Sequence, residues 1–383
     1  MIVAAVLVFV AGFVVSLVGT WVARRWAGRL GLMDSPGERK VHVVATPRNG
    51  GIGIFLGIAL PILLAIYIVS TIRVPLRSYE GQLVSGAMLH TPLALLLLAC
   101  TAVIHTIGLM DDRNAMAAWP KLLLQLGAAT ALVGIGELLA GGGFRMFTVL
   151  DQMMPGGAVV SGIISVLWIV ALTNAFNFLD NMDGLSAGVA FLCALMFLVA
   201  ASLSGQWFIC GLLLVFMGAV GGFLVFNFPP ASIFMGDGGS MVLGFFLSAL
   251  TIRTTYYGMS GEHRWYTVLM PLIILAVPLY DLLLVTVLRV AAGKSPMTGD
   301  TNHFSHRLTR HGFTKRGAVL VIYAVTLAIG ISAPLLTLVR DDAGAVLIGL
   351  QTLAMLIVIG ILERVGAHTH FAAKAQAPSR DET

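Results

Sequence analysis

The chain has 383 residues, of which 58% are hydrophobic and only 11% are charged, and its formal net charge is +5. A mean hydropathy of +0.94 with so few charges excludes an ordinary soluble domain, which needs a much larger charged surface to stay dispersed. The net charge by itself says little, and we expect no nucleic-acid partner.

The hydrophobic residues come in long runs, and a run of about 20 such residues is enough to cross the hydrocarbon core of a bilayer. Eleven runs of this kind occur, near residues 1–23, 51–70, 89–109, 120–140, 159–178, 186–204, 207–226, 239–252, 266–290, 317–339 and 343–363. The sequence therefore predicts an all-α, polytopic membrane protein with about eleven transmembrane helices, or ten if the short run 239–252 does not cross.

Two features of these runs have plain explanations. The first run lacks a basic segment ahead of it, and Arg24 and Arg25 follow it, so we expect a retained span and not a signal peptide. Cys100, Cys193 and Cys210 all lie inside runs, where cysteine behaves as a small buried hydrophobic residue; we expect no disulfide and no thiolate metal site.

The distribution of Lys and Arg predicts the orientation. With the N-terminus outside, seventeen of the 23 Lys and Arg residues fall on the cytoplasmic side, as the positive-inside rule requires. All densely polar, motif-like loops then fall on that side too, at 31–51, 108–114, 174–185, 227–240 and 293–316. We expect one integral-membrane domain, 1–363, with cytoplasmic active-site loops and a polar, disordered tail, 364–383.

The first polar loop is a basic cluster that includes Lys40 and Arg48 and leads into a helix that begins near Gly50-Gly51. Such a cluster is suited to an anionic lipid head group or a diphosphate.

The second loop contains the carboxylate doublet Asp111-Asp112. Adjacent carboxylates repel each other, so one pKa rises unless a cation neutralises the pair. The doublet indicates a divalent metal or a general base; a solvated loop is the alternative.

The third loop has amides and carboxylates at three-residue steps: Asn174, Asn177, Asp180 and Asp183. On a helix this spacing places side chains on neighbouring parts of one face. Carboxylates at membrane depth persist mainly where they pair, bind cations or line water. The series therefore predicts one polar pocket at the membrane surface, with a solvated capping series as the alternative.

The fourth loop ends in a glycine-rich turn around Asp237, just before another apolar run. The free amides of a helix N-terminus suit a phosphate, and a carboxylate there is placed to hold Mg²⁺ against a diphosphate, unless it is only a helix cap. Phe234 can stack on a base or anchor the chain in the membrane interface.

The last loop carries Lys294, His303, His306 and Arg307. Such groups bind phosphates and sugar hydroxyls, and the positive-inside rule explains the cations but not the histidines. Asp281, inside the run before this loop, is either functional or tied to a neighbouring helix. Taken together, the five loops favour phosphoryl transfer, in which positioning and charge stabilisation do most of the work.

The same five loops resemble the polyprenyl-phosphate N-acetylhexosamine-1-phosphate transferase superfamily. The matching motifs are DSPGERKVH…TPRNGG, GLMDD, NAFNFLDNMDG, FMGDGGS and GKSP…HFSH, in family order from residue 31 to about 316. The superfamily includes phospho-N-acetylmuramoyl-pentapeptide transferase and undecaprenyl-phosphate N-acetylglucosaminyl-1-phosphate transferase.

The resemblance implies roles for particular residues. The implied catalytic residues are Asp111, Asp112, Asp180 and His303. The implied substrate-binding residues are Asn177, Asp183, Phe234, Lys40, Arg48, His306 and Arg307. The implied metal ligands are Asp237 and Asp180, for Mg²⁺, with Mn²⁺ as a substitute.

The implied reaction moves a sugar-1-phosphate, foremost GlcNAc-1-phosphate, from a UDP-sugar to polyprenyl (undecaprenyl) phosphate and releases UMP. It would begin a cell-envelope glycan at the inner membrane of a bacterium. The family's histidines are adjacent, whereas here Phe-Ser separates His303 from His306, which leaves the sugar open. The span count favours the N-acetylglucosaminyl branch, with UDP-MurNAc-pentapeptide as the alternative donor.

Two rival classes remain at this stage, and the oligomeric state stays open, a homodimer included. A CDP-alcohol phosphatidyltransferase also has a DxxDG element, but it continues with Ala-Arg, whereas Gly184 is followed here by Leu-Ser-Ala-Gly. A transporter would use intramembrane carboxylates near the bilayer midplane, whereas these motifs lie at one end of the spans.

Overall fold

The computed structural model describes residues 2–34, 45–71, 79–140, 143–148, 150–254, 265–295, 302–339 and 341–375. Within these residues the chain is helical except for connecting segments and one antiparallel pair of two-residue strands, β1 and β2. Helices are expected of apolar spans, because a helix satisfies its own backbone hydrogen bonds where lipid offers none. The prediction of an all-α membrane protein is confirmed.

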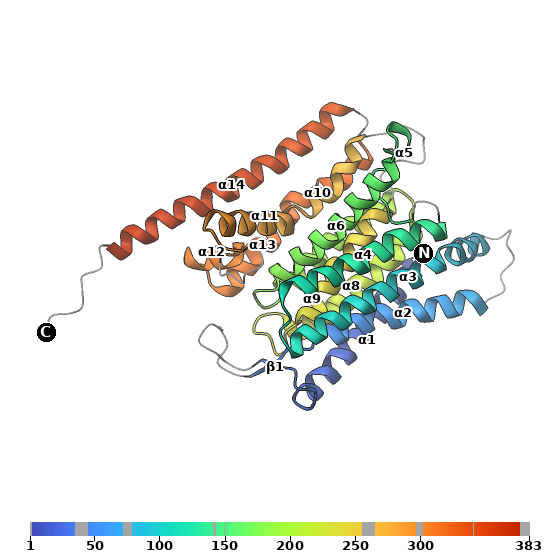
Figure 1. The fold of residues 1–383 in the computed structure, drawn as a ribbon, viewed down its shortest axis with the longest axis horizontal. Coiled ribbons are helices and arrows are strands. Elements are labelled where there is room, and N and C mark those ends of the chain that lie inside the picture. The colour runs from blue at the N-terminus through green and yellow to red at the C-terminus, as the bar shows by residue number, and fades with distance from the viewer. Residues whose placement is uncertain are drawn as a thin grey trace.

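The elements follow the chain in this order: α1 (Ile2–Leu30), β1 (Met33–Asp34), β2 (Thr46–Pro47), α2 (Gly51–Thr71), α3 (Tyr79–Arg113), α4 (Ala118–Ala140), α5 (Leu150–Met153), α6 (Gly157–Leu179), α7 (Leu185–Leu203), α8 (Trp207–Asn227), α9 (Asp237–Arg253), η1 (Trp265–Leu269), α10 (Met270–Ile274), α11 (Ala276–Ala291), α12 (Phe304–Arg310), α13 (Lys315–Gly330), η2 (Ala333–Thr337) and α14 (Asp342–Ala375). Figure 1 shows them side by side as one bundle, with α14 along its outer edge.

All eleven predicted runs are helical, but three differ from single α-helical spans. The run 317–339 consists of α13 and the 3-10 helix η2. Nine helices of the described residues are long and apolar enough to cross a membrane. The run 239–252 forms α9, which has only 17 residues. The sequence predicts one helix over the run 266–290, but the structure divides this run into η1, α10 and α11. Pro271 and Pro278 each remove a backbone donor there, which explains the breaks. The number of spans and their orientation stay predictions.

Helix α9 lies at the centre of the bundle, against α2, α3, α6 and α7. Every residue from Gly238 to Thr251 is buried. At 1.5 Å per residue the helix is about 25 Å long, shorter than the hydrocarbon core of about 30 Å. Its first residue, Asp237, lies against Gly108, five residues before the end of α3.

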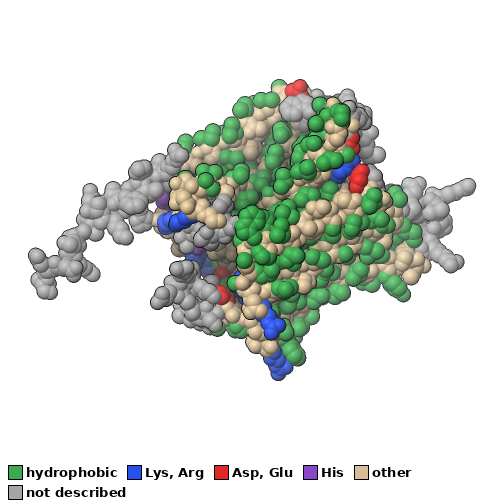
Figure 2. Space-filling view, in the orientation of Figure 1, with side chains coloured by type: hydrophobic (Ala, Val, Ile, Leu, Met, Phe, Trp, Pro, Cys, Tyr) green, Lys and Arg blue, Asp and Glu red, His purple; other side chains and the backbone are tan. Residues whose placement is uncertain are grey.

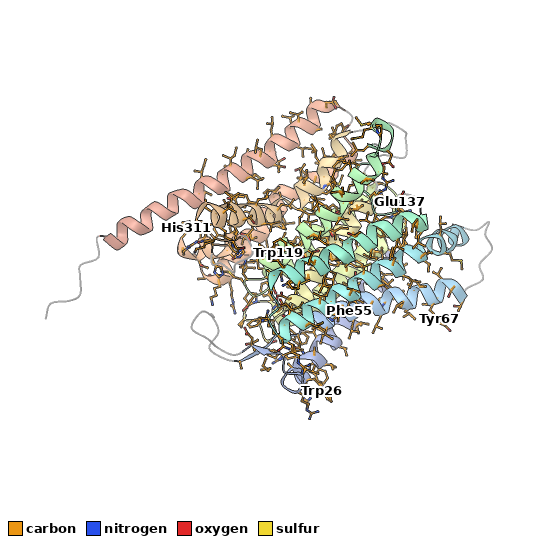
Figure 3. The ribbon with its side chains drawn as sticks, viewed as in Figure 1. Trp26, Phe55, Tyr67, Trp119, Glu137 and His311 are labelled. Carbon is orange, nitrogen blue, oxygen red and sulfur yellow. The ribbon has the colours of Figure 1, made fainter. Side chains whose placement is uncertain are left out.

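The two ends of the bundle are polar and its flank is apolar. Figure 2 shows hydrophobic side chains along the flank, with Lys, Arg, Asp, Glu and His gathered toward the ends. Aromatic residues mark both ends, as in membrane interfaces: Trp26 and Trp119 lie toward one end and Tyr67 toward the other (Figure 3).

The last helix, α14, continues to Ala375 and so extends past residue 363, where the sequence analysis expects the tail to begin. The expected disorder of residues 376–383 lies outside the described residues.

Candidate active site

The α1–α2, α6–α7, α8–α9 and α12–α13 connections enclose a cavity of about 650 Å³ at one end of the bundle. The size is typical of a site for a small molecule. Its lining includes Asp34, Arg48, Asn177, Asp180, Asp183, Phe234, Asp237, His306 and Lys315. Seven of the predicted site residues are thus brought to one cavity, although they come from four connections far apart in the sequence.

Backbone hydrogen bonds join the segment before α2 to the segment before α9. The amide of Phe234 donates to the carbonyl of Pro47 at 2.8 Å, and the amide of Gly50 donates to the carbonyl of Phe234 at 2.9 Å. The pairing holds Arg48, from the first loop, beside Asp237, from the fourth. The nearest pair of their charged atoms, Arg48 Nη2 and Asp237 Oδ1, is 3.5 Å apart.

Asp112 supports the start of α9. Its two oxygens accept hydrogen bonds from the amides of Asp237, at 2.8 Å, and Gly238, at 2.9 Å, and its side chain is fully buried. The carboxylate thus caps a helix N-terminus from a different helix, and it also pairs with Arg48 Nε at 3.0 Å. A Cβ at Gly108 would lie 2.5 Å from the Asp237 backbone, so glycine is required for this approach.

Asp111, the other carboxylate of the doublet, is connected to the site by a lysine. Lys121, in the first turn of α4, donates to Asp111 Oδ2 at 3.0 Å and also to the carboxylate of Asp237. Asp111 additionally accepts a hydrogen bond from the amide of Met116 at 2.6 Å. Lys121 therefore links α3 and α4 to α9 at the point where Asp237 meets the cavity.

Arg48 stays charged in this setting. Burial by itself lowers the pKa of Arg48, but the neighbouring carboxylates of Asp112 and Asp237 outweigh it and raise that pKa above its usual value. Two fixed positive charges, on Arg48 and Lys121, therefore accompany the carboxylates at the start of α9.

The polar series of the third loop divides at the end of α6. Asn177 lines the cavity and donates to Ser240 Oγ at 2.9 Å, while Asp183 accepts from the amide of Ala231 at 3.0 Å. Asn174 lies one turn deeper and donates to Gln125 Oε1 at 2.7 Å, outside the cavity lining. The expectation that all four side chains share one pocket is therefore correct for three of them.

Asp180 lies on the cavity wall in surroundings that disfavour its ionised form. Burial, together with the charges of Asp237 and Asp112, raises the pKa of Asp180 to about 8. A raised pKa means that the ionised form of the carboxyl group is destabilised. A cation beside the carboxylate would stabilise this form.

Phe234 and the α6–α7 connection form another part of the wall. The amide of Gly184 donates to Asn227 Oδ1 at 2.9 Å, and Asn227 Nδ2 donates to the carbonyl of Ile233 at 2.8 Å. Asn227 thus ties the α6–α7 connection to the segment that carries Phe234, whose ring edges the cavity. A flat aromatic side chain held in this way is suited to stacking on a planar base.

Helix α12 brings only one of its three predicted residues to the cavity. His306 lines it, and burial together with the neighbouring imidazole of His303 lowers the pKa of His306. His303 is buried, with Nδ1 at 2.8 Å from Asp281 Oδ2. Arg307 is also buried and donates to the carbonyl of Asn302. Of the described residues of α12, His306 and Thr309 are the ones on the cavity wall.

Two lysines differ from the other basic residues of the site in how far the sequence and the structure agree on them. Lys40, predicted to bind substrate, lies outside the described residues. Lys121 is not among the predicted site residues, although its contacts place it at the centre of the carboxylate cluster. The one signal was its position in the first turn of an otherwise apolar helix, which a topology argument explains equally well.

The site has the chemistry for a magnesium ion shared with a substrate. Among the described residues, no group of three or more His, Cys, Asp or Glu side chains is placed to hold a metal on its own. Mg²⁺ is commonly held, however, by one or two carboxylates together with substrate phosphates. Asp180 and Asp237, both on the cavity wall, supply that number of hard oxygen ligands. The residues therefore fit a Mg²⁺ that binds together with a diphosphate.

The fold and the site define a polytopic membrane protein with a cavity lined by carboxylates and cations at one end of its bundle. Residues 94–255 match the model of glycosyl transferase family 4. A probable undecaprenyl-phosphate N-acetylglucosaminyl 1-phosphate transferase of Bacillus subtilis is 32% identical over 86% of this chain and 84% of its own. The decaprenyl-phosphate N-acetylglucosaminephosphotransferase of Mycobacterium tuberculosis is 33% identical, over 94% and 89% respectively.

A third relative, the undecaprenyl-phosphate alpha-N-acetylglucosaminyl 1-phosphate transferase of Escherichia coli K12, is 27% identical over 78% of this chain and 75% of its own. The chain belongs to this family, the polyprenyl-phosphate N-acetylhexosamine-1-phosphate transferases.

Proposed function

We propose that the protein transfers GlcNAc-1-phosphate from UDP-GlcNAc to a polyprenyl phosphate, giving polyprenyl-diphosphate-GlcNAc and UMP. The relatives named above carry this sugar and this class of lipid in their names, which supports the proposal. The product would be the first lipid-linked intermediate of a cell-envelope glycan. The alternatives, a UDP-MurNAc-pentapeptide donor and a transporter, are not favoured by these relatives.

One observation carries the proposal: Asp180, Asp237 and Arg48 share a cavity with the aromatic ring of Phe234. A nucleotide sugar needs this combination, because its base calls for a flat apolar surface and its diphosphate calls for cations. Asp180 and Asp237 would hold a Mg²⁺, with Mn²⁺ as a substitute. When bound, the ion would neutralise charge on the diphosphate.

The residues of the chain divide the remaining work. Arg48 and Lys121 supply fixed positive charge next to Asp237, where the diphosphate would lie. Phe234, Asn177 and Asp183 would orient the nucleotide, and His306 would face the sugar phosphate. Lys40 would join Arg48 in binding anionic groups, in keeping with the basic character of the first loop.

In the bond-making step, an oxygen of the polyprenyl phosphate attacks the phosphorus that carries the sugar. The bond from that phosphorus to the oxygen bridging it to UMP breaks, and UMP leaves with that oxygen. Asp111, paired with Lys121, would position the lipid phosphate and accept any proton it carries. We favour direct attack over a covalent aspartyl intermediate.

The positive-inside count supports an inner-membrane protein with its N-terminus outside and this site in the cytoplasm, where UDP-sugars are made. The lipid would reach the site sideways from the bilayer, since its tail cannot leave the apolar phase.

The test is UMP release by purified protein in detergent with undecaprenyl phosphate, Mg²⁺ and a panel of UDP-sugars. We expect UMP with UDP-GlcNAc, and expect EDTA to remove the activity and added Mg²⁺ to restore it. UMP from UDP-MurNAc-pentapeptide alone would overturn the choice of donor. No UMP from any sugar, with folded protein, would overturn the reaction.

A further inference from the structure

Helix α12 is held at its start by a carboxylate from a different helix. Asp281, in α11, accepts a hydrogen bond from the amide of Phe304 at 2.6 Å, and its second oxygen is 2.8 Å from His303 Nδ1. The N-cap residue of α12 is His303, whose own side chain makes no capping bond. Asp281, from another helix, therefore accepts the hydrogen bond that an N-cap side chain of α12 would otherwise accept.

Asp281 is buried in a position where an ionised carboxylate would destabilise the fold without hydrogen-bond partners. Its side chain is 1% exposed and lies in an apolar helix, where an ionised carboxylate is unfavourable without partners. Both oxygens are occupied, one by a backbone amide and one by an imidazole. The carboxylate thus has two partners, and both belong to the first turn of α12.

The orientation of α12 decides which side chains reach the cavity. His306 and Thr309, one turn apart, line it, whereas Phe304 and Leu308 are buried on the other side. The hydroxyl of Ser305 also donates to Asn181, in the α6–α7 connection. A rotation of this seven-residue helix would turn His306 away from the cavity.

We propose that Asp281 is a positioning residue, which acts through His303 and the amide of Phe304 to fix α12 so that His306 faces the cavity. This inference rests on the proposed function for its kinetic test. It also revises the expected role of His303. That imidazole is buried against Asp281 and the ring of Phe178, at 5.9 Å between ring centres, and serves as the partner of Asp281.

His303 needs different chemical groups as the partner of Asp281 than as a catalytic residue. An ionised carboxylate only accepts hydrogen bonds, so His303 must present an N–H from Nδ1 to Asp281. The amide nitrogen of an asparagine can present an N–H near the same position, whereas alanine cannot. If His303 instead exchanged protons with the substrate, neither asparagine nor alanine could take over its role.

The kinetic test compares His303→Ala, His303→Asn and Asp281→Asn by kcat/KM for UMP release. We expect His303→Ala and Asp281→Asn to lower kcat/KM by about 10- to 100-fold, and His303→Asn to stay within about threefold of the wild type. A loss in His303→Asn as large as that in His303→Ala would show that the imidazole itself is required and would overturn the proposal.

The matched control is Val285→Ala, one turn along α11 from Asp281, where a fully buried apolar side chain is shortened. It should lower thermal stability and leave kcat/KM within about twofold. An equal loss of activity in this variant would mean that the packing of α11, and not the carboxylate, is what matters, and would overturn the proposal. If Asp281→Asn does not fold, the two His303 variants carry the test.

A second readout needs no activity. The three native cysteines, Cys100, Cys193 and Cys210, are buried, so a thiol introduced by His306→Cys can be labelled selectively with a water-soluble maleimide. Adding Asp281→Asn should change the labelling rate, and adding Val285→Ala should not. An unchanged rate with Asp281→Asn would overturn the proposal. Wild-type protein that makes no UMP would defeat the proposed function, while the labelling result would still decide the role of Asp281.

Discussion

The two ends of the bundle both hold an arginine between carboxylates, but they use it differently. At the end away from the cavity, Arg145 donates to Glu137 at 2.9 and 3.1 Å and to Asp151 at 2.8 and 2.7 Å. Each carboxylate is bound by two guanidinium N–H groups. This end is a closed clamp that ties the segment before α6 to α4.

At the cavity end, the carboxylates are paired less completely than in the clamp. Arg48 and Lys121 are shared among Asp111, Asp112 and Asp237, and Asp180 stands on the cavity wall with a raised pKa. Only the buried Asp112 is matched by two backbone amides as well as a cation. The remaining negative charge faces an open cavity.

The difference indicates what each cluster is for. A set of charges that satisfies itself contributes to structure and little else. A set whose carboxylates share their cations beside a cavity is suited to bind a further cation and the phosphates that come with it. Substitutions of the charged residues at the cavity end should therefore act on turnover, and substitutions of those at the other end on stability alone.

The largest expected effect is at Asp237. Asp237→Asn keeps the shape of the side chain but removes the charge at the start of α9, and we expect kcat to fall by about 1000-fold or more. UMP release at saturating substrates measures it, with thermal unfolding as the control for folding. Substantial residual turnover in a folded variant would contradict the metal-binding role.

Lys121 should come next. Lys121→Met keeps most of the length of the side chain but leaves Asp111 and Asp237 without their shared cation. We expect kcat to fall by about 100-fold, since fixed positive charge near the diphosphate is lost. Gln125→Leu, one turn deeper on α4 and outside the cavity lining, is the control for damage to the helix. A kcat within about threefold of wild type would argue that Lys121 belongs with Arg145 as a structural cation.

Phe234 should affect binding more than turnover. Phe234→Leu removes the flat ring, and we expect KM for the UDP-sugar to rise about tenfold with little change in kcat. Phe234→Tyr keeps the ring and should stay near the wild type. Equal falls in kcat and kcat/KM for Phe234→Leu would instead place the ring at the reacting phosphate and refute the stacking role.

The approach of α3 to α9 should be sensitive to one methyl group. Gly108→Ala places a Cβ against the Asp237 backbone, and overpacking of this kind costs about 1–3 kcal/mol of stability. Gly127→Ala, on α4, meets nothing within 4 Å and should be neutral or slightly stabilising. Thermal unfolding in detergent compares the two. Equal stability would mean that the two helices are not held as close as described.

The smallest effect on activity is expected at the clamp. Arg145→Ala breaks the contacts with Glu137 and Asp151, and we expect a fall of a few degrees in unfolding temperature with kcat/KM within about twofold of wild type. A large loss of turnover would remove the contrast between the two ends.

Local patterns predicted the fold and most of the cavity. Runs of apolar residues form helices in a membrane. Once the orientation of the spans is predicted, the polar loops between them must lie at one end of the bundle. Asn177, Asp180, Asp183, Phe234, Asp237, Arg48 and His306 meet at one cavity, although the roles assigned to them stay predictions.

What local patterns missed depends on contacts between helices. The three-residue spacing of the third loop assumes a continuous helix, but α6 ends at Leu179, and Asn174 lies too deep to reach the cavity. Nothing in the doublet distinguishes Asp111, which meets Lys121, from Asp112, which caps α9. Likewise, the pairing of His303 with Asp281 joins residues from two helices, and no spacing rule predicts it.

The most direct test of the account follows one phosphorus atom. UDP-GlcNAc labelled with ³²P in the phosphate next to the sugar is incubated with purified protein, Mg²⁺ and undecaprenyl phosphate, and the label is followed between the aqueous and lipid phases. The account predicts that the label enters the lipid in step with the appearance of unlabelled UMP. Label that remains on the nucleotide as UDP, with sugar alone moved to the lipid, would contradict sugar-1-phosphate transfer.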